Sequence, residues 1–424
     1  MIIFCGILLI SSSAWALQPL AEFLNQARSR SFDAREADVA ARQRSLESEA
    51  AFGRLLPTVS ARGVYTRNQY ETAVTLPNGP SIVITPQNQL DAIFQVDLPI
   101  LDLASHHRYR QASRAADVAE SQRALVGARL DQAVTRLYFS FLGAGALFEA
   151  SKRSLAIAED NLKFINTRRE LGVASELDQE RARANLERAK QDVTDAQLVG
   201  LTVARQLQTL TGLTPTPADS YLTDDLHAEP PLSAWLSAQD TPEERVQAAL
   251  SEMAREGEKA AKAALLPTLS ANAQERVSNA GGFSGHSSTY ALQAVLSWRL
   301  DYSTYKTAQA QALGSEAQSI HTARVRRGVD DAIFDAYHRV VSGIARSASA
   351  RAQAEASKKA EALALERYKA GTLTQLDVTQ SQRDAFQAEA ARIQADADLA
   401  FSRALLRIAS GQSPVAAGAP QQIR

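Results

Sequence analysis

Histidines are the residues in this chain best suited to binding a metal ion or moving protons, and five of them can be judged from their neighbours in sequence. None has a carboxylate or a cysteine at the spacing of a ligand set. A metal centre needs several nitrogen, oxygen or sulfur ligands at one point. We therefore expect solvated side chains and no metal site at these residues: His106, His107, His286, His321 and His338.

Sulfur chemistry and catalysis find little support in the sequence. Cys5 is the only cysteine, and Met253 is the only methionine after Met1, so no cluster of soft ligands exists. The chain has no phosphate-binding glycine loop, no nucleophile paired with a base and no pair of acids in a pocket-forming context. We expect no cofactor and predict that the protein is not an enzyme.

Two aspartates, Asp178 and Asp377, remain as candidates for a functional charge because both occupy the same place in a repeated pattern. Each lies a few residues after a glycine, Gly172 or Gly371. Ser175 with Asp178 three residues later has the spacing of a capping box, and Gly172 suits the left-handed end of a preceding helix. As plain structure, both aspartates are acids in the first turn of a helix.

The elements around these turns form an internal repeat. A shift of 199 positions places Val134 on Ile333 and Tyr138 on Tyr337. Residues 103–170 contain no proline and carry apolar residues at helical spacing. A helix of that length measures about 100 Å. A rod of this length is not a core element of a compact domain.

The charge balance and the N-terminus narrow the class of protein. The chain has 46 Lys and Arg residues and 47 Asp and Glu residues, so it has no excess of positive charge of the kind that binds nucleic acid. Residues 1–16 resemble a signal peptide: Ile2–Ile10 are apolar, and Ala14-Trp15-Ala16 forms a small-x-small cleavage site. A short N-terminal anchor or a misassigned start is the alternative. Cleavage would remove Cys5 and leave no thiol.

Two segments change from helical periodicity to alternation, and we interpret each as a β-hairpin. The first spans 57–101 with a turn at Pro77-Asn78-Gly79-Pro80, and the second spans 267–300 around Gly281-Gly282. Each strand has about ten residues, with one apolar and one largely polar face. No internal run reaches the roughly 20 apolar residues of a membrane-spanning helix. If this chain enters a membrane, it must do so with strands.

The predicted domain organisation follows from these elements. Repeat 1 covers 17–212, repeat 2 covers 242–411, and a linker occupies 213–241. The last segment, 412–424, is predicted to be disordered. The expected elements are a short helix, the hairpin 57–101, a long helix 103–170 and a return helix 175–210, followed in repeat 2 by a short helix, the hairpin 267–300, a long helix 302–369 and a return helix 374–410.

Four strands cannot close a barrel, and an open sheet edge is not tolerated in hydrocarbon. Two copies would give eight strands with a filled interior, and three copies would give twelve with a lumen. The predicted fold is mainly α with a membrane β-barrel to which each chain contributes four strands; in a trimer, the long helical hairpins would form an α-barrel that continues into a twelve-stranded β-barrel. Tyr65, Tyr290 and Trp298 lie where an interfacial aromatic belt is expected, with core packing as the alternative.

The turn motifs carry a family resemblance. Residues 171–178, Leu-Gly-Val-Ala-Ser-Glu-Leu-Asp, and residues 368–377, Tyr-Lys-Ala-Gly-Thr-Leu-Thr-Gln-Leu-Asp, occur at equivalent points of the two repeats. With the repeat plan, they resemble the TolC-like outer membrane efflux protein family, the outer membrane factors. The resemblance implies a homotrimer in the bacterial outer membrane with a periplasmic helical domain, docked to a periplasmic adaptor (membrane fusion) protein and an inner-membrane transporter.

In that family the turns are the periplasmic tips of a tunnel, and the resemblance assigns roles to them. Tyr368, Asp377 and Asp178 match residues at the closing aperture, whereas Leu373 replaces an arginine and Gln380 replaces a second inward acid. These departures put ionic latching of a closed aperture in doubt and allow a looser or a differently held gate. The adaptor-docking candidates at the tips are Gly172, Val173, Ala174, Gly371, Thr372 and Leu373.

We thus predict a passive exit duct of a tripartite efflux or type I secretion system. Small molecules, metal ions and polypeptides all suit such a duct as cargo. The competing interpretation is an exported coiled-coil structural or adaptor protein whose hairpins form a soluble β-domain.

Overall fold

The computed structural model describes residues 18–75, 77, 79, 81–216, 223–237 and 241–415. The expected signal peptide over 1–16, two residues of the predicted turn (Asn78 and Pro80) and residues 416–424 of the expected disordered tail lie outside the described residues, as do parts of the linker. Among the residues that the structure describes, no helix combines the length and hydropathy needed to span a bilayer.

The chain divides into two compact units, and both repeats contribute to each. The helical unit comprises the described residues of 1–37, 123–243 and 326–424. The sheet unit comprises residues 38–122 and 244–325. The helical turns lie in the first unit and the strands in the second.

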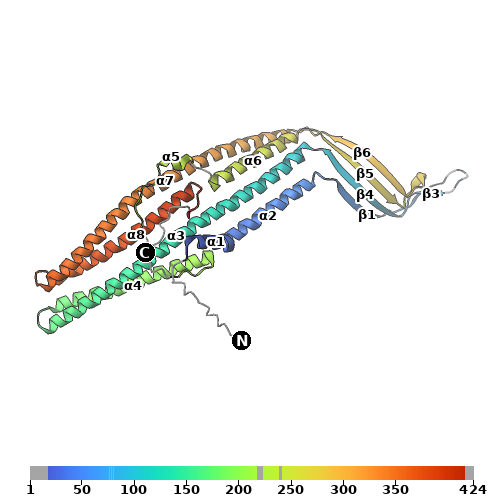
Figure 1. The fold of residues 1–424 in the computed structure, drawn as a ribbon. Helices are drawn as coiled ribbons and strands as arrows, with labels where there is room; N and C mark the ends of the chain where they lie inside the picture. Colours follow the sequence, from blue (N-terminus) through green and yellow to red (C-terminus); the bar gives the residue numbers. More distant parts are fainter. Residues whose placement is uncertain are drawn as a thin grey trace, which may run out of the picture. The chain divides into compact units, whose positions relative to one another are not determined.

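The sheet unit contains a four-stranded antiparallel sheet in the order β1-β4-β5-β6 (Figure 1). The strands are β1 Thr58–Arg67, β4 Asn88–Leu101, β5 Thr268–Ser278 and β6 Ser288–Ser297. Strands β1 and β4 come from the first repeat and β5 and β6 from the second. The two predicted hairpins are therefore joined by β4 and β5 into one sheet.

Large apolar side chains on this sheet are exposed rather than packed on a core. Tyr290 is 82% exposed and Leu292 is 75% exposed, and every residue of β1 and β6 is exposed in the chain. Such a surface is larger than the scattered apolar residues of a water-facing protein. The sheet therefore lacks a covering layer within the described part of the chain.

The segment around the predicted turn of the first hairpin was expected to be a polar loop, but it contains a second, two-stranded sheet. Strand β2, Thr72–Thr75, pairs with β3, Ser81–Thr85. Both strands are rich in β-branched residues, which favour extended backbone. A loop prediction based on the proline and glycine cluster alone missed these flanking strands.

Two helices of 68 residues dominate the α-structure: α3 spans Leu103–Glu170 and α7 spans Tyr302–Lys369, the ranges placed from the sequence. The return helices α4, Glu176–Thr211, and α8, Gln375–Ala409, start and end within one residue of the expected positions. Helix α6 spans Pro242–Ala263. Figure 1 shows α3 with α4, and α7 with α8, as two helical hairpins.

The first helical segment differs from the prediction. One helix was expected over Pro19–Phe52, but the structure has α1, Leu20–Arg30, and α2, Phe32–Gly53. Between them Ser31 is extended, and its hydroxyl accepts the N–H of Ala34 at 3.1 Å. A serine that can cap the next helix competes with continuation of the first. The predicted linker contains a short helix, α5, Leu232–Ser237.

In the sheet unit, the helices are arranged in the same sequence as the strands that they join. Helix α2 contacts α3 through Phe52 and Tyr109, whose ring centroids are 5.3 Å apart. Helix α3 contacts α6 at Gln111, whose amide lies against Gly257. Helix α6 contacts α7 through the hydroxyls of Ser251 and Thr322, 2.8 Å apart. The order α2, α3, α6, α7 thus parallels β1, β4, β5, β6.

Helix α1 packs in the helical unit through an apolar cluster. Phe23 is fully buried, and its ring centroid lies 5.8 Å from that of Tyr138 on α3. Arg28 on α1 also forms an ion pair with Asp131 on α3. The buried members of the cluster are Phe23, Leu24, Ala27, Leu130, Val134 and Leu207. This cluster fixes α1 on one face of α3 and α4.

Truncating Phe23 should therefore loosen α1. Phe23→Ala is expected to cost about 3–5 kcal/mol, because the lost ring leaves a cavity. The measurement is unfolding of the purified protein by circular dichroism, with limited proteolysis to follow α1. Phe283→Ala, the same truncation at an exposed site, is the control. Equal effects of the two substitutions would contradict the proposed role of this cluster.

Candidate functional site

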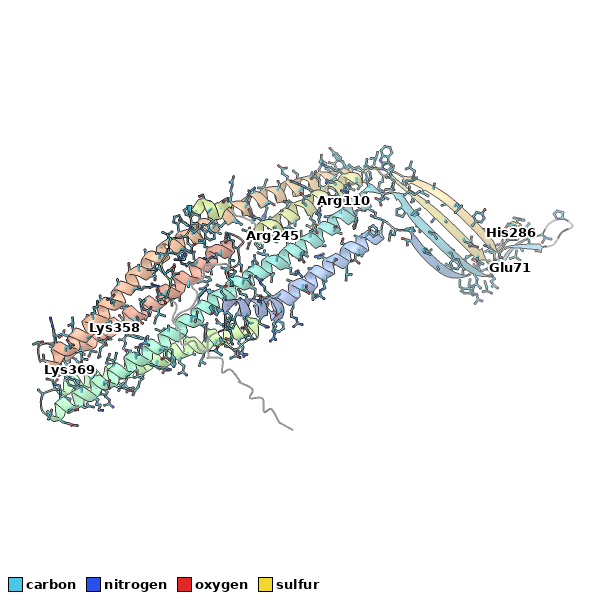
Figure 2. All side chains as sticks on the ribbon, viewed as in Figure 1. Glu71, Arg110, Arg245, His286, Lys358 and Lys369 are labelled. Atoms are coloured by element: carbon cyan, nitrogen blue, oxygen red, sulfur yellow. The ribbon has the colours of Figure 1, made fainter. Side chains whose placement is uncertain are left out.

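The two helical turns have the same backbone geometry. Gly172 has φ 74° and Gly371 has φ 79°, in the left-handed region that favours glycine. The N–H of Val173 donates to the carbonyl of Arg168 at 2.8 Å, and the N–H of Thr372 donates to that of Arg367 at 2.9 Å. These bonds satisfy carbonyls at the ends of α3 and α7 and produce tight turns. Figure 2 labels Lys369 at the end of α7.

Each return helix begins with a capping box, as predicted for Ser175 and Asp178. The N–H of Asp178 donates to Ser175 Oγ at 3.1 Å, and the N–H of Ser175 donates to Asp178 Oδ2 at 3.2 Å. In repeat 2 the N–H of Thr374 donates to Asp377 Oδ2 at 2.9 Å. Both carboxylates therefore already serve their own helix starts.

The capping box also changes the acidity of Asp377. The hydroxyl of Thr374 donates to this carboxylate, and with the backbone N–H of Thr374 it holds the pKa of Asp377 below the ordinary value of 3.8. The ionised form is the one that accepts both bonds. Asp377 is thus a charged helix cap at neutral pH.

Tyr368 is buried between the two helical hairpins. Its ring packs with Ile165 and Val378 in one apolar cluster. Arg168, on α3, places its guanidinium 5.1 Å from the centroid of the Tyr368 ring and donates to the Tyr368 carbonyl at 3.4 Å. Burial raises the pKa of the Tyr368 hydroxyl, although the charge of Arg168 opposes this. In a single chain Tyr368 joins the hairpins and is not open to solvent.

The other aperture candidates do not all lie beside Tyr368. Leu373 packs against the Tyr368 cluster, whereas Gln380 is exposed and donates to Asp384 at 2.9 Å. The structure thus brings Tyr368 and Leu373 together, places Asp178 and Asp377 at helix starts and leaves Gln380 apart.

Four of the six docking candidates at the tips are exposed, whereas Ala174 and Leu373 are half-buried and pack against the Tyr368 cluster. Val173 is exposed, as are the backbone turns at Gly172 and Gly371. Leu171 and Leu177 on the first tip are also exposed and were not singled out from the sequence. Apolar residues next to a tight glycine turn could have indicated them from the sequence, because such a turn has no interior in which to bury their side chains.

The three aromatic candidates of the sheet are all exposed: Tyr65, Tyr290 and Trp298. Trp298 Nε1 donates to the carbonyl of Leu265 at 3.1 Å, and the hydroxyl of Tyr65 donates to Asn88 at 2.9 Å. The Tyr65 and Trp298 rings thus present an apolar face while their polar atoms are hydrogen bonded. Their exposure does not fit core packing, and the interfacial belt stays a prediction.

The expectation of solvated histidines fails at His107. Its Nδ1 lies 2.9 Å from Glu256 Oε2, and Glu256 also accepts from Lys259 at 2.8 Å. Burial raises the pKa of Glu256, but the bonds from Lys259 and His107 outweigh burial and lower it. The acid lies 149 residues from the histidine in sequence, so spacing along the chain could not reveal the pair.

A buried charge cluster around Arg403 was also missed. Arg403, on α8, donates to Asp224 at 2.8 and 3.0 Å and to Glu229 at 2.5 Å. Arg351, on α7, donates to the carbonyl of Asp224 at 2.8 Å. Opposite charges keep the pKa of Arg403 raised despite burial. The cluster fixes residues 223–229 of the linker on one face of α7 and α8.

One group of possible metal ligands lies in this linker, at Asp224, Asp225 and His227, whose ligand atoms are within 4.8 Å of one another. His227 was not considered from the sequence. Asp224 already accepts two bonds from Arg403, and Asp225 Oδ1 lies 2.5 Å from His227 Nδ1. These contacts account for the grouping as part of the Arg403 cluster.

Comparison with known proteins agrees with the turns and the fold. Residues 23–213 match the model of a family described as outer membrane efflux protein. No curated protein sequence matches the chain.

The fold is shared with solved outer-membrane channels. The Campylobacter jejuni CmeC outer membrane channel has a TM-score of 0.81 at 17% identity, over 93% of this chain and 86% of that chain. The open state of the Neisseria gonorrhoeae MtrE channel gives 0.77 at 19%, over 94% and 90%. The Vibrio cholerae outer membrane protein VceC gives 0.75 at 14%, over 93% and 96%. The fold class expected from the sequence is confirmed.

Removing the charge of the cap should change the acid response of the second tip. Because folding lowers the pKa of Asp377, this carboxylate stabilises the native state above its ordinary value of 3.8, and the contribution is lost as pH falls through the lowered value. We expect the first turn of α8 to lose amide protection in acid. In Asp377→Asn, the amides of this turn should exchange severalfold faster at neutral pH. Their protection should show no further loss in acid.

The measurement is hydrogen exchange by mass spectrometry between neutral pH and about pH 3, corrected for the intrinsic rate. Asp384→Asn, which removes an acid outside the box, is the control. A loss of amide protection in acid that persists in Asp377→Asn would contradict the role of this carboxylate as the titrating cap.

Proposed function

We propose that the chain, of which residues 23–213 match the outer membrane efflux protein family, is the exit duct of a tripartite efflux or type I secretion machine. Three copies form one hollow cylinder with a periplasmic helical part. Solute enters at the helical tips and leaves by diffusion. As a transport protein of this family, the chain is not an enzyme, and partner proteins supply the energy.

The single observation that supports this proposal best is the open edge on each side of the sheet. In the described part of the chain, β1 pairs only with β4 and β6 pairs only with β5. An unpaired edge presents free N–H and C=O groups, which lipid cannot satisfy. Pairing β1 of one copy with β6 of the next removes both edges at once.

The helices of the sheet unit present matching unpartnered faces. On α2, Val39 and Leu46 are seven residues apart and 62% and 64% exposed. On α7, Leu313 and Ile320 are also seven residues apart and are 66% and 64% exposed. A seven-residue repeat of apolar side chains is the pattern that packs one helix on another. The faces lie on the two outer helices, so the same neighbouring copy that pairs the strands covers them.

The number of copies follows from the lumen. Four strands per chain give eight in a dimer, whose interior side chains fill, and twelve in a trimer, which leaves space for solute. The exposed apolar face at Tyr290 and Leu292 then faces lipid. The alternative of an exported scaffold requires a core against which this face packs, and the described residues provide none.

The tips are the proposed docking surface for a periplasmic adaptor that links the duct to an inner-membrane transporter. The turns are tight, repeated and exposed, and Leu171, Val173 and Leu177 add apolar area. Apolar groups of this kind form the centre of protein interfaces. Rigid caps at Asp178 and Asp377 hold the docking backbone in one conformation.

A charge on the outer face of α7 should separate the copies. Ile320→Lys is expected to convert the trimer to monomer, because a lysine would be buried in an apolar seam without a partner. The readout is the trimer band on unheated gels and light scattering in detergent. Ser319→Lys, one position away and exposed, is the control and should remain trimeric. A stable Ile320→Lys trimer would argue against this seam.

Crosslinking can test the tips directly. Cysteines introduced as Val173→Cys and Thr372→Cys, in a background from which Cys5 has been cleaved, should form adducts with the adaptor in cells. His286→Cys, in an exposed loop of the sheet unit (Figure 2), should form none. Adducts at His286→Cys alone would reject the docking surface at the tips.

A further inference from the structure

A wide cleft lies between the helical hairpins of the helical unit. Its volume is about 640 Å³, and α3, α4, α7 and α8 all contribute to its walls. Its polar lining includes Arg136, Arg339, Arg346 and Asp398, with Phe401 beside them. None of these residues has been assigned to the turns or to the seams between copies.

The charge of this cleft is positive. Its lining contains three arginines and one carboxylate, and that carboxylate, Asp398, already accepts a hydrogen bond from Gln394 at 2.9 Å. Arg136 lies 6.0 Å from the centroid of the Phe401 ring. Among the described residues, none of the three arginines forms an ion pair. Arginine stays charged at any pH the cell reaches.

The cleft opens on one side of α8, and the linker covers the other side. Asp396 and Arg403 are the α8 residues joined to Arg351 and to the linker. At 3.6 residues per turn, Asp398 and Phe401 lie roughly 140–200° around the helix from Asp396. The cleft and the linker therefore occupy opposite faces of α8.

Helix α3 shows the same division. Val134 and Tyr138 pack against α1. Arg136 lies two residues from each of them, and so on roughly the opposite face of the helix. Gly143 on α3 approaches Ala397 on α8 so closely that a Cβ atom on the glycine would be 3.3 Å from the alanine Cβ. Both residues line the cleft, so this close contact between α3 and α8 forms part of its wall.

We propose that this cleft lines the lumen and that its arginines form an anion-selective ring, so that the duct favours anionic solutes. The inference rests on the proposed function. A cylinder can carry solute only if α1 and the linker lie outside it, because inside they would obstruct the lumen. The opposite face, which holds the cleft, then looks inward. Three copies bring three arginines each to the same level.

The chemistry of the ring defines the ligand class. Guanidinium groups bind carboxylate and phosphate oxygens through paired N–H donors. A concave wall of low dielectric concentrates their potential and raises the local anion concentration. Rings of arginine or lysine are a known means of selecting anions in pores. Small carboxylates and phosphate-bearing solutes are thus the favoured cargo, and cations are disfavoured.

The test is ion selectivity of the purified trimer in planar lipid bilayers. The reversal potential in a potassium chloride gradient gives the ratio of chloride to potassium permeability, and citrate serves as a trivalent blocker. We expect the wild type to favour chloride and to be blocked by citrate. Arg339→Gln with Arg346→Gln should lower the permeability ratio by about fivefold and weaken the block. Arg339→Lys with Arg346→Lys, which keeps the charge, should restore both.

The matched control is Arg183→Gln with Arg205→Gln. Both arginines are exposed on α4, and neither lines the cleft. An unchanged ratio and block in the cleft variant would overturn the inference, as would loss of the trimer in that variant, which would place the cleft between copies. Absence of any conductance in the wild-type trimer would instead reject the proposed function itself.

Discussion

The unpaired backbone at the two edges of the sheet is the constraint on which the rest of this structure depends. Strands β1 and β6 each have one free side within the described residues. In water such edges invite aggregation, and in lipid they cost several kcal/mol for each unsatisfied group. A closed ring of copies removes the cost for every strand. Helices α2, α3, α6 and α7 follow the same order as the strands. In the proposed ring, the sheet and the helical layer therefore close together.

The physical signals along the chain explain which parts of the fold were predictable. Helices α3 and α7 have no internal proline and end at glycine turns, so their bounds could be placed from the residues alone. The break at Ser31 could not, because serine is tolerated within helices and acts as a cap only when the backbone turns. The pairing of β4 with β5 joins strands far apart in sequence, and only tertiary packing selects it.

In the candidate site, too, local features could be predicted from the sequence and long-range contacts could not. Capping boxes and left-handed glycines are local, and the sequence was sufficient to place Asp178 and Gly172. Contacts such as His107 with Glu256, or Arg403 with Asp224, join residues 149 and 179 positions apart. Neither partner stands out alone, since a charged residue on a helix usually faces water. Tyr368 shows a third case: the motif drew attention to it, but its burial against Arg168 depends on how the hairpins pack.

The pairing of β4 with β5 has a consequence for how such a molecule assembles. A chain with a single repeat would have to find this neighbour by diffusion, and twice as many copies would have to meet. Joining two repeats in one polypeptide makes this contact intramolecular, where the partner strand is held at a high effective concentration. In the proposed trimer, half of the contacts between neighbouring hairpins would thereby form during folding of each chain, before any second copy is encountered. Assembly would then depend less on the amount of protein in the cell.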